Sequence, residues 1–160
     1  MDPIAVVDAL TASDIAVART LIEEYAASLD VDLAYQNLSH ELEHLGEVYA
    51  PPAGALLLAR RGDEAVGCVA FRPFDADTCE MKRLYVRPGC RGLAIGRTLA
   101  LAAIGRACAR GYRRIVLDTL TTMGEARDLY RSLGFRETAP YNRAPTGGIV
   151  YMELEVMSGR

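Results

Sequence analysis

Residues 80–97 read EMKRLYVRPGCRGLAIGR. We predict that a strand ending at Val86 runs into a loop rich in glycine and arginine, which opens directly onto a long helix from Ala94 to Arg110. The first amides of a helix lack partners within it and the helix dipole is positive there, so such a start binds anions. The residues small enough to let a pyrophosphate group approach these amides are Gly92, Ala94 and Gly96.

Basic side chains are concentrated in the same stretch, in a chain whose formal net charge is −3. They are Lys82, Arg83, Arg87, Arg91 and Arg97. An anion-binding site explains this local concentration. The alternative from spacing alone is that the glycines only shape a turn and the basic residues form a solvated face.

The flanking sequence alternates between segments with the helical period and segments typical of strands. Strands are predicted at residues 4–7, 55–59, 65–71, 79–86, 115–118, 135–141 and 149–156. Helices are predicted from a cap at Ser13 to Ala27, from Leu33 to Leu45, over 94–110, and from Glu125 to Leu133. Short turn-rich connections make the three middle strands an antiparallel meander.

The order of these elements predicts an α+β fold, an α/β sandwich with a mixed sheet. No internal repeat or linker-like segment divides the chain. We therefore expect one domain over residues 1–157, followed by a short tail at 158–160.

Composition argues against several classes of function. An excess of acidic over basic residues is unlike the broad basic face of a general nucleic-acid-binding protein. No segment approaches the ~18 uninterrupted apolar residues of a membrane span, and no secretory signal is visible, so we expect a cytoplasmic protein. The four cysteines lack C-x-x-C spacing, which predicts reduced thiols, with a contact between Cys68 and Cys79 as the alternative to simple burial.

Two segments resemble motifs of the GCN5-related N-acetyltransferases, the GNAT family. Residues 91–96, RGLAIG, resemble the coenzyme A signature: Arg or Gln, two variable residues, Gly, a variable residue, and Gly or Ala. In the family this signature follows a strand that ends like residues 84–88. Residues 126–135, ARDLYRSLGF, resemble the late helix with its tyrosine and closing Gly-Phe pair. The order of elements also matches the family over nearly the whole chain.

The resemblance implies a mixed, mostly antiparallel sheet of about six to seven strands flanked by about four helices. It implies an acetyl-CoA-dependent N-acetyltransferase, which moves an acetyl group to a primary amine by direct attack in a ternary complex. The amine could belong to a small molecule or a peptide, and a homodimer stays open by analogy. The alternative is a non-catalytic domain that binds acetyl-CoA as a sensor or interaction partner.

The residues that the resemblance assigns to the cofactor are Leu84, Tyr85, Val86, Arg91, Gly92, Leu93, Ala94, Ile95, Gly96 and Arg97. The backbone of residues 84–86 is expected to hold the pantetheine arm by strand-like hydrogen bonds and to polarise the acetyl carbonyl through an amide. Ala94 departs from the pattern, since the family most often has glycine there. An alanine fits if its φ and ψ are helical, although its methyl group narrows the approach of a phosphate.

The resemblance also implies two catalytic residues. Tyr130 stands where the family often has a phenol near the sulfur, so it is the candidate acid for the departing thiolate. Its alternative is a tyrosine packed on the cofactor or the core. Glu80 stands at the place of the glutamate base of the histone-modifying members, and strand alternation puts it on the face of Leu84 and Val86. Its alternatives are pairing with Lys82 and contact with the substrate.

Residues 40–44, HELEH, satisfy the H-E-x-x-H pattern of zinc proteases. The sequence contains only these two histidines, and no downstream helix offers a convincing third ligand. We therefore expect no metal, and we expect the histidines to lie on the surface or line the acceptor side. A zinc hydrolase is the remote alternative.

The acceptor side carries no specific signature and is expected from residues 25–49, 71–77 and 141–148. Tyrosines that could form an apolar wall with hydroxyl groups, or simply pack in the core, are Tyr35, Tyr49 and Tyr141. Acidic residues that could attract a cationic amine, or form a solvated helix face, are Glu41, Glu43 and Glu47.

Overall fold

The computed structural model describes residues 3–29, 37–90, 94–142 and 147–156. The strands are β1 (Ile4–Asp8), β2 (Ala55–Arg61), β3 (Glu64–Pro73), β4 (Thr78–Val86), β5 (Arg114–Leu120), β6 (Arg136–Glu137) and β7 (Ile149–Glu155). The helices are α1 (Ala12–Ala27), α2 (Leu38–Glu43), α3 (Leu45–Val48), α4 (Ile95–Ala109) and α5 (Gly124–Ser132). Predicted features outside the described residues are Tyr35, Arg91, Gly92, Leu93, the start of the second helix and the tail at 158–160.

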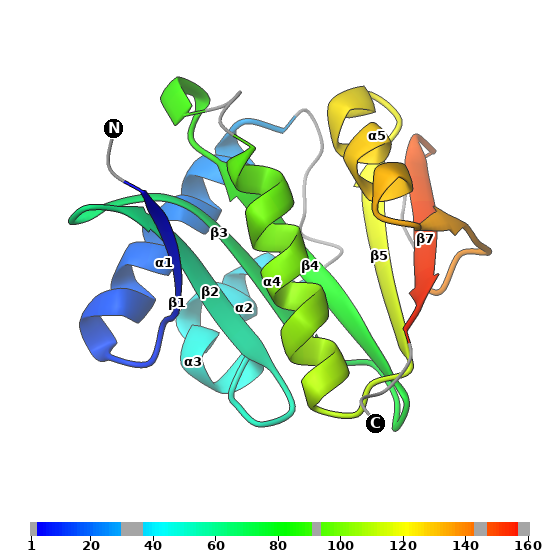
Figure 1. The fold of residues 1–160 in the computed structure, drawn as a ribbon, viewed down its shortest axis with the longest axis horizontal. Coiled ribbons are helices and arrows are strands. Elements are labelled where there is room, and N and C mark those ends of the chain that lie inside the picture. The colour runs from blue at the N-terminus through cyan, green and yellow to red at the C-terminus, as the bar shows by residue number, and fades with distance from the viewer. Residues whose placement is uncertain (1–2, 30–36, 91–93, 143–146, 157–160) are drawn as a thin grey trace.

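The strands form one seven-stranded sheet in the order β1-β2-β3-β4-β5-β7-β6 (Figure 1). Strands β4 and β5 pair in parallel, because α4 carries the chain back across the sheet between them. The other neighbouring strands pair antiparallel. This confirms the predicted fold class, a mixed and mostly antiparallel sheet between helices.

The helices cover the two faces of the sheet unequally. Helix α4 crosses one face over β1 to β4, and α5 lies beside it over β5 (Figure 1). Helix α1 packs on the opposite face against β2, β3 and β4, with α3 packed against α1. Each face has its own buried core, built around Leu57 and Leu99 on the α4 side and around Leu21 and Leu58 on the α1 side.

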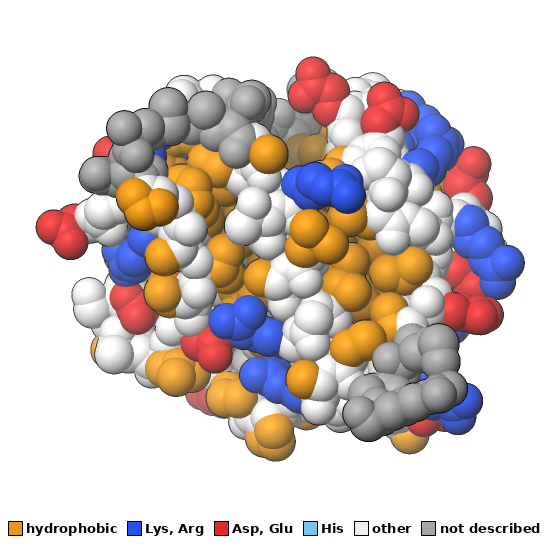
Figure 2. Space-filling model, in the orientation of Figure 1, with side chains coloured by type: hydrophobic (Ala, Val, Ile, Leu, Met, Phe, Trp, Pro, Cys, Tyr) orange, Lys and Arg blue, Asp and Glu red, His pale blue; other side chains and the backbone are white. Residues whose placement is uncertain are grey.

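On the face that α4 and α5 cover, hydrophobic side chains gather beside α4, and charged side chains lie around them, including along the edge near α5 and β7 (Figure 2). Alanines on the inner side of α4, such as Ala103 and Ala107, are fully buried. Small side chains let a helix lie close to the sheet.

Three predicted element boundaries are wrong. The cap of α1 is Thr11 instead of Ser13, because the Thr11 side chain accepts a hydrogen bond from the Asp14 amide at 3.1 Å. The second helix is broken at His44, whose φ and ψ are −123° and 32°, so its described part forms α2 and α3. Strand β6 is only two residues long. Strand β4 begins one residue before its predicted start, and α4 ends at Ala109, two residues before Gly111 with its φ of 90°.

All four cysteines are free thiols. Cys68 belongs to the core on the α1 side, and Cys79 belongs to the core on the α4 side. The two side chains therefore lie on opposite faces of the sheet, which rules out the cross-strand contact considered from the sequence.

The Glu153 carboxylate on β7 joins the last three strands and predicts how acid affects stability. It accepts hydrogen bonds from Arg114 and Thr138 at 2.8 Å and from Arg136 at 3.2 Å. These donors, Arg114 first, lower the pKa of Glu153 from 4.5 to about 2. A carboxyl group with a depressed pKa stabilises the fold above its unfolded-state pKa, and that contribution is lost as pH falls through the folded-state pKa.

We therefore expect the free energy of unfolding to fall between pH 4.5 and about 2 less steeply in Glu153→Gln than in the unchanged protein. Urea unfolding at a series of pH values measures this difference. Glu43→Gln, an exposed change on α2 away from this carboxylate, is the control.

Candidate active site

Strands β4 and β5 separate partway along their length. Their pairing runs from Thr78 opposite Arg114 only as far as Glu80 opposite Val116. Beyond that point β4 continues through Leu84 to Val86, and β5 continues to Leu120. The separation opens the middle of the sheet at one end, next to the start of α4.

A bulge in β4 lies at this opening. Ala70 of β3 pairs with Lys82 of β4, and Cys68 of β3 pairs with Tyr85 of β4. The step between these two pairs is two residues along β3 but three residues along β4, so β4 contains one extra residue. Arg83, within the bulge, has a left-handed backbone with φ 63°. The extra residue reverses the alternation of side chains along the rest of the strand.

The bulge overturns one prediction. Lys82 pairs with Ala70, which belongs to the core on the α1 side, so Glu80 and Lys82 point to that face. Leu84 and Val86 pack against the core on the α4 side. Glu80 therefore does not share a face with Leu84 and Val86, because strand alternation does not continue through a bulge.

A buried ion pair holds the bulge from the α1 side. The Arg83 guanidinium donates from Nε and Nη2 to the two carboxylate oxygens of Glu41 on α2, both at 2.8 Å. The exposed fractions of these side chains are 3% and 2%. Burial by itself raises the pKa of Glu41, but the hydrogen bonds and charge of Arg83 together outweigh it and lower that pKa. The pair is bidentate and desolvated, the geometry in which an ion pair fixes a conformation.

A groove of about 620 Å³ lies between the end of β4, the start of α4 and α5. The predicted cofactor residues that line it are Leu84, Tyr85, Val86, Ala94, Ile95, Gly96 and Arg97. The first backbone hydrogen bond of α4 runs from the Thr98 amide to the Ala94 carbonyl at 3.1 Å, so the amides of residues 95–97 precede the helical ladder. The volume of the groove fits a nucleotide-bearing ligand, and the amides of residues 95–97, which have no acceptor within the helix, fit its phosphate groups.

The basic residues near the groove have different partners. Arg97 lines the groove and donates to the Ser132 hydroxyl at 3.0 Å. Arg87 forms an ion pair with Glu24 at 2.9 Å. Lys82 and Arg83 contact Glu80 and Glu41 on the α1 side of the sheet. Four of the basic residues between positions 80 and 97 are described by the structure, and Arg97 is the one among these four that lines the groove.

Ala94 has a left-handed backbone, with φ 58° and ψ 23°. The helical conformation under which alanine was expected to fit is therefore wrong. The left-handed region costs a residue with a Cβ atom roughly 1–2 kcal/mol, whereas glycine adopts it freely. This cost accounts physically for a preference for glycine at the position.

Ala94→Gly is accordingly expected to leave stability unchanged or to raise the free energy of unfolding by up to about 1 kcal/mol, since relief of strain exceeds the added chain entropy. Ala16→Gly, in the exposed middle of α1, should instead lower it by about 1 kcal/mol. Chemical denaturation compares the two. Losses of similar size in both variants would contradict the left-handed conformation of Ala94.

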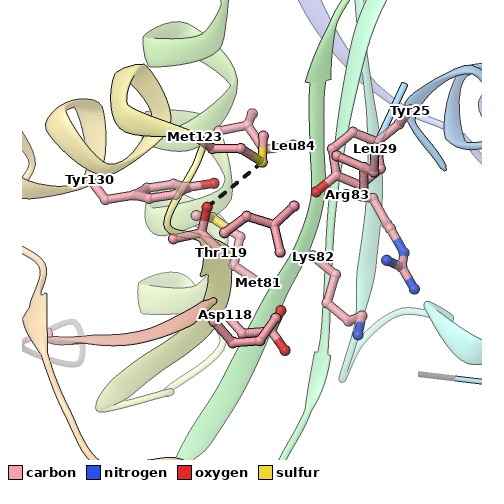
Figure 3. Close-up of a pocket in the computed structure, with 12 residues that line it drawn as sticks. Tyr25, Leu29, Met81, Lys82, Arg83, Leu84, Asp118, Thr119, Met123 and Tyr130 are labelled. Carbon is pink, nitrogen blue, oxygen red and sulfur yellow. Dashed lines mark hydrogen bonds between the residues drawn. The ribbon is translucent and has the colours of Figure 1, made fainter. Parts of the chain in front are cut away.

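A narrower pocket of about 30 Å³ adjoins the groove and shares Tyr25, Leu84 and Met123 with it. Tyr130 reaches into this pocket from α5, toward Thr119 and Met123 (Figure 3). Lys82 and Asp118 line the same pocket from the other side of the opening. Burial raises the pKa of the Tyr130 phenol, which keeps it protonated at neutral pH.

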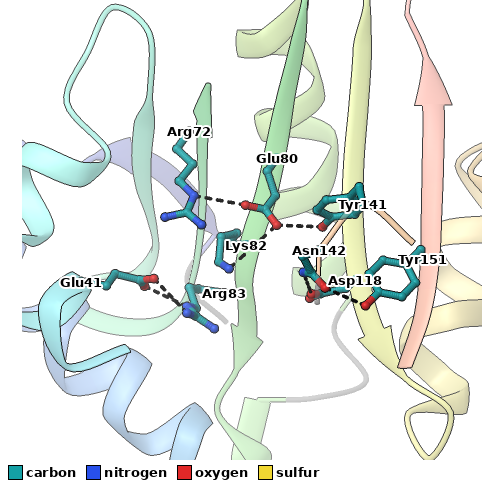
Figure 4. A network of polar contacts seen from close by, with 9 residues as sticks. All are labelled: Glu41, Arg72, Glu80, Lys82, Arg83, Asp118, Tyr141, Asn142 and Tyr151. Carbon is teal, nitrogen blue, oxygen red and sulfur yellow. Dashed lines mark hydrogen bonds and ion pairs between the residues drawn. The ribbon is translucent and has the colours of Figure 1, made fainter. Parts of the chain in front are cut away.

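A polar network occupies the α1 face where β4 and β5 separate (Figure 4). Glu80 accepts hydrogen bonds from Arg72 Nε at 3.1 Å and from the Tyr141 hydroxyl at 2.7 Å, and Lys82 Nζ lies 3.9 Å from its Oε2. Beside it, Asn142 donates to Asp118 at 2.9 Å and accepts from Tyr151 at 2.6 Å. The network holds two carboxylates and two cations next to the pocket.

Several residues of this site were missed by the sequence reasoning. Asp118, Asn142 and Tyr151 come from three separate segments, and only the fold brings them together beside Lys82, the possible partner of Glu80 named from the sequence. A signal existed for Asp118, which is the only charged residue in the largely apolar run from Ile115 to Leu120. Of the tyrosines considered for the acceptor wall, Tyr141 joins the network, whereas Tyr49 is buried in the α1-side core.

Residues 40–43 of the HELEH segment lie in α2, and His44 is the C-cap of this helix. Its first glutamate, Glu41, is bound to Arg83 and buried, so it is not available as the general base of a metalloprotease. The rings of His40 and His44 lie 4.6 Å apart, and His44 Nδ1 is 3.5 Å from Glu47. Within the ranges that the structure describes, no three His, Cys, Asp or Glu side chains gather as a metal site would require.

The groove at the start of α4 suits a phosphorylated ligand, and the smaller pocket beside it is lined by Lys82 and Asp118 of the polar face. Residues 18–135 match the acetyltransferase (GNAT) family. The chain belongs to this family and is an acetyl-CoA-dependent N-acetyltransferase, which confirms the resemblance and the predicted enzyme class.

Relatives are found in distant organisms. An uncharacterized N-acetyltransferase of Schizosaccharomyces pombe is 45% identical over 142 residues, covering 86% of each chain. The uncharacterized N-acetyltransferase YjgM of Escherichia coli is 32% identical over 136 residues, covering 83% of this chain and 80% of its own. An acetyltransferase structure from Streptococcus agalactiae shares the fold with a TM-score of 0.80 at 21% identity, covering 96% of this chain and 98% of its own.

Proposed function

We propose that the protein transfers the acetyl group of acetyl-CoA to a primary amine by direct attack, with both substrates bound together. The observation that carries this proposal is that the groove and the pocket that contains Tyr130 share lining residues, and that Lys82 and Asp118 of the polar face line the same pocket. A structure of a Salmonella typhimurium acetyltransferase with its cofactor acetyl-CoA has the same fold, with a TM-score of 0.71 at 19% identity, covering 96% of this chain and 94% of its own.

In this proposal the backbone at the end of β4 holds the donor. The parallel pairing with β5 ends at Glu80, so the segment from Leu84 to Val86 faces the groove. Its amides bind the pantetheine arm, and one of them polarises the thioester carbonyl. The first amides of α4 bind the pyrophosphate, with Arg97 supplying a positive charge.

In this proposal two side chains transfer protons, Glu80 as the general base and Tyr130 as the general acid. The amine first loses a proton to Glu80 through a water molecule, and its nitrogen then bonds to the acetyl carbon. As the carbon–sulfur bond breaks, Tyr130 donates a proton to the thiolate, and the second amine proton restores the phenol through solvent. The products are an N-acetyl amide and coenzyme A with a free thiol.

The base is tested with Glu80→Gln. Because a glutamine side chain cannot take up the proton, the variant should lose the acidic limb of the pH–rate profile with its preferred amine. Glu137→Gln, at an exposed position on β6, is the control. An unchanged profile in Glu80→Gln would remove Glu80 from the mechanism.

Turnover itself separates an enzyme from a domain that only binds acetyl-CoA. Release of coenzyme A thiol, coupled to formation of an N-acetyl product, is expected with at least one amine. A cytoplasmic location is part of this proposal. None of the helices in the described part of the chain combines the length and apolar character that a membrane crossing requires.

A further inference from the structure

Two consecutive residues of the segment after β6, Tyr141 and Asn142, bridge the place where β4 and β5 separate. The parallel pairing of these strands ends at Glu80 opposite Val116. The Tyr141 hydroxyl donates to Glu80 Oε2 on β4 at 2.7 Å, and Asn142 Nδ2 donates to Asp118 Oδ2 on β5 at 2.9 Å (Figure 4). The segment therefore binds one carboxylate from each of the two strands at the end of their pairing.

The ring of Tyr141 contacts two aromatic neighbours. Phe74, between β3 and β4, and Tyr151 on β7 each pack nearly perpendicular to it, with centroids 5.3 Å away. The Tyr151 hydroxyl also donates to Asn142 Oδ1 at 2.6 Å, which anchors the segment to β7. This packing fixes the direction of the Tyr141 hydroxyl independently of its bond to Glu80.

The two oxygens of the Glu80 carboxylate receive donors from different elements. Arg72 Nε on β3 donates to Oε1 at 3.1 Å, and the Tyr141 hydroxyl donates to Oε2. Lys82 Nζ lies 3.9 Å from Oε2, beyond hydrogen-bonding distance. Of these two groups near Oε2, the Tyr141 hydroxyl is the one that forms a hydrogen bond, so it sets the orientation of this oxygen.

Tyr141 adds a hydrogen-bond donor to the network without adding a charge. The formal charges of Arg72 and Lys82 are offset by those of Glu80 and Asp118. Burial, and then the charges of Glu80 and Asp118, raise the pKa of the Tyr141 phenol, which keeps it protonated as a donor at neutral pH. Loss of the hydroxyl would therefore change the hydrogen bonding of Glu80 and leave the charge balance as it is.

We propose that Tyr141 is a positioning residue, whose hydroxyl orients the Glu80 carboxylate and stabilises its ionised form. This inference rests on the proposed role of Glu80 as the general base. A hydrogen bond donated to a carboxylate favours the ionised form, which is the form that can take up a proton from the amine. Tyr141 itself exchanges no proton with the substrate.

The test is the pH dependence of kcat/KM in Tyr141→Phe, with the amine that gives the fastest thiol release. The variant keeps the ring and loses the hydroxyl, so Glu80 should take up a proton at higher pH. The midpoint of the acidic limb should move up by about one pH unit. Below both midpoints kcat/KM should be about tenfold lower than in the unchanged protein, with a much smaller loss on the plateau. An unmoved midpoint would overturn the inference.

Two further variants separate the hydroxyl from other causes. Asn142→Ala loosens the same segment but keeps the Tyr141 hydroxyl, so the midpoint should move less than half as far. Tyr112→Phe removes a hydroxyl that also donates at 2.7 Å, from a ring that also packs edge-on against a phenylalanine, and should leave the midpoint unchanged. A shift in Asn142→Ala equal to that in Tyr141→Phe would contradict the assignment to the hydroxyl.

The charged groups around Glu80 are the same in Tyr141→Phe and in the unchanged protein. In the described part of the network they are Arg72 on β3, Lys82 on β4 and Asp118 on β5. Because Glu80→Gln removes the carboxylate, adding Tyr141→Phe to it should cause no further change in the pH dependence. A further shift in the double variant would show that Tyr141 acts on another group, and would refute its role toward Glu80.

The profile of Glu80→Gln alone separates this inference from the proposed function. If that variant loses the acidic limb while Tyr141→Phe keeps the original midpoint, the positioning role is refuted and the proposed base stands. If Glu80→Gln keeps the limb, Glu80 is not the base, and the role of Tyr141 falls with it. An equal rise in melting temperature with acetyl-CoA verifies that both variants are folded with an intact cofactor groove.

Discussion

Tyr130→Phe is expected to lower kcat by about 10²–10⁴-fold, the range typical of a lost general acid. The phenol lies in the pocket beside Leu84 and Met123, and burial raises its pKa so that it holds a proton to donate. The ring itself, packed against Phe135 with centroids 5.6 Å apart, is retained in the variant. The KM for acetyl-CoA and the melting temperature should therefore change little.

Tyr112→Phe is the matched control. Tyr112 and Tyr130 are both 7% exposed and belong to the same core, but the Tyr112 hydroxyl donates to the Ala53 carbonyl at 2.7 Å, outside the pocket. Its loss should cost about 1 kcal/mol of stability and leave kcat close to its original value. Equal kcat values for Tyr130→Phe and the unchanged protein would exclude Tyr130 as the acid.

Glu41→Ala is expected to give the largest loss of stability, about 3–5 kcal/mol in the free energy of unfolding. The change leaves the Arg83 guanidinium buried without the carboxylate that accepts both of its hydrogen bonds. Because Arg83 lies within the β4 bulge, the segment from Leu84 to Val86 should also lose its fixed position. We expect the KM for acetyl-CoA to rise in any fraction that stays folded.

Glu43→Ala provides the comparison on the same helix. Glu43 is exposed, so its replacement should change stability by no more than about 0.5 kcal/mol. The double change Glu41→Leu with Arg83→Met removes both buried charges and should recover much of the stability lost in Glu41→Ala. Equal stability of Glu41→Ala and Glu43→Ala would show that the buried pair does not hold the bulge.

The sequence was sufficient to predict the groove because its signals are local. A strand, a glycine-rich loop and a helix follow one another within residues 80–97, and the sequence order alone places them at one corner of the sheet. The parallel pairing of β4 with β5 follows from the intervening helix, since a crossover returns the chain in the same direction. The fold class was predictable for the same reason.

The polar face could not be predicted in this way. A single extra residue at Arg83 moves every later side chain of β4 to the other face of the sheet. The alternation of side chains along the sequence does not reveal this extra residue. The partnership of Arg83 with Glu41 spans 42 residues and joins a strand to a segment whose sequence suggested a zinc site. Asp118, Asn142 and Tyr151 meet only through strand register and the return of the chain after β6.

The most direct test of the cofactor groove is the melting temperature of the protein with acetyl-CoA. A ligand at 100 times its Kd stabilises the folded state by about 2.7 kcal/mol, which corresponds to a rise of roughly 5–10 °C for a domain of this size. We expect such a rise, reduced when dephospho-CoA replaces the complete cofactor or when Arg97 is changed to Glu. No rise with any coenzyme A derivative at millimolar concentration would contradict the assignment of the groove.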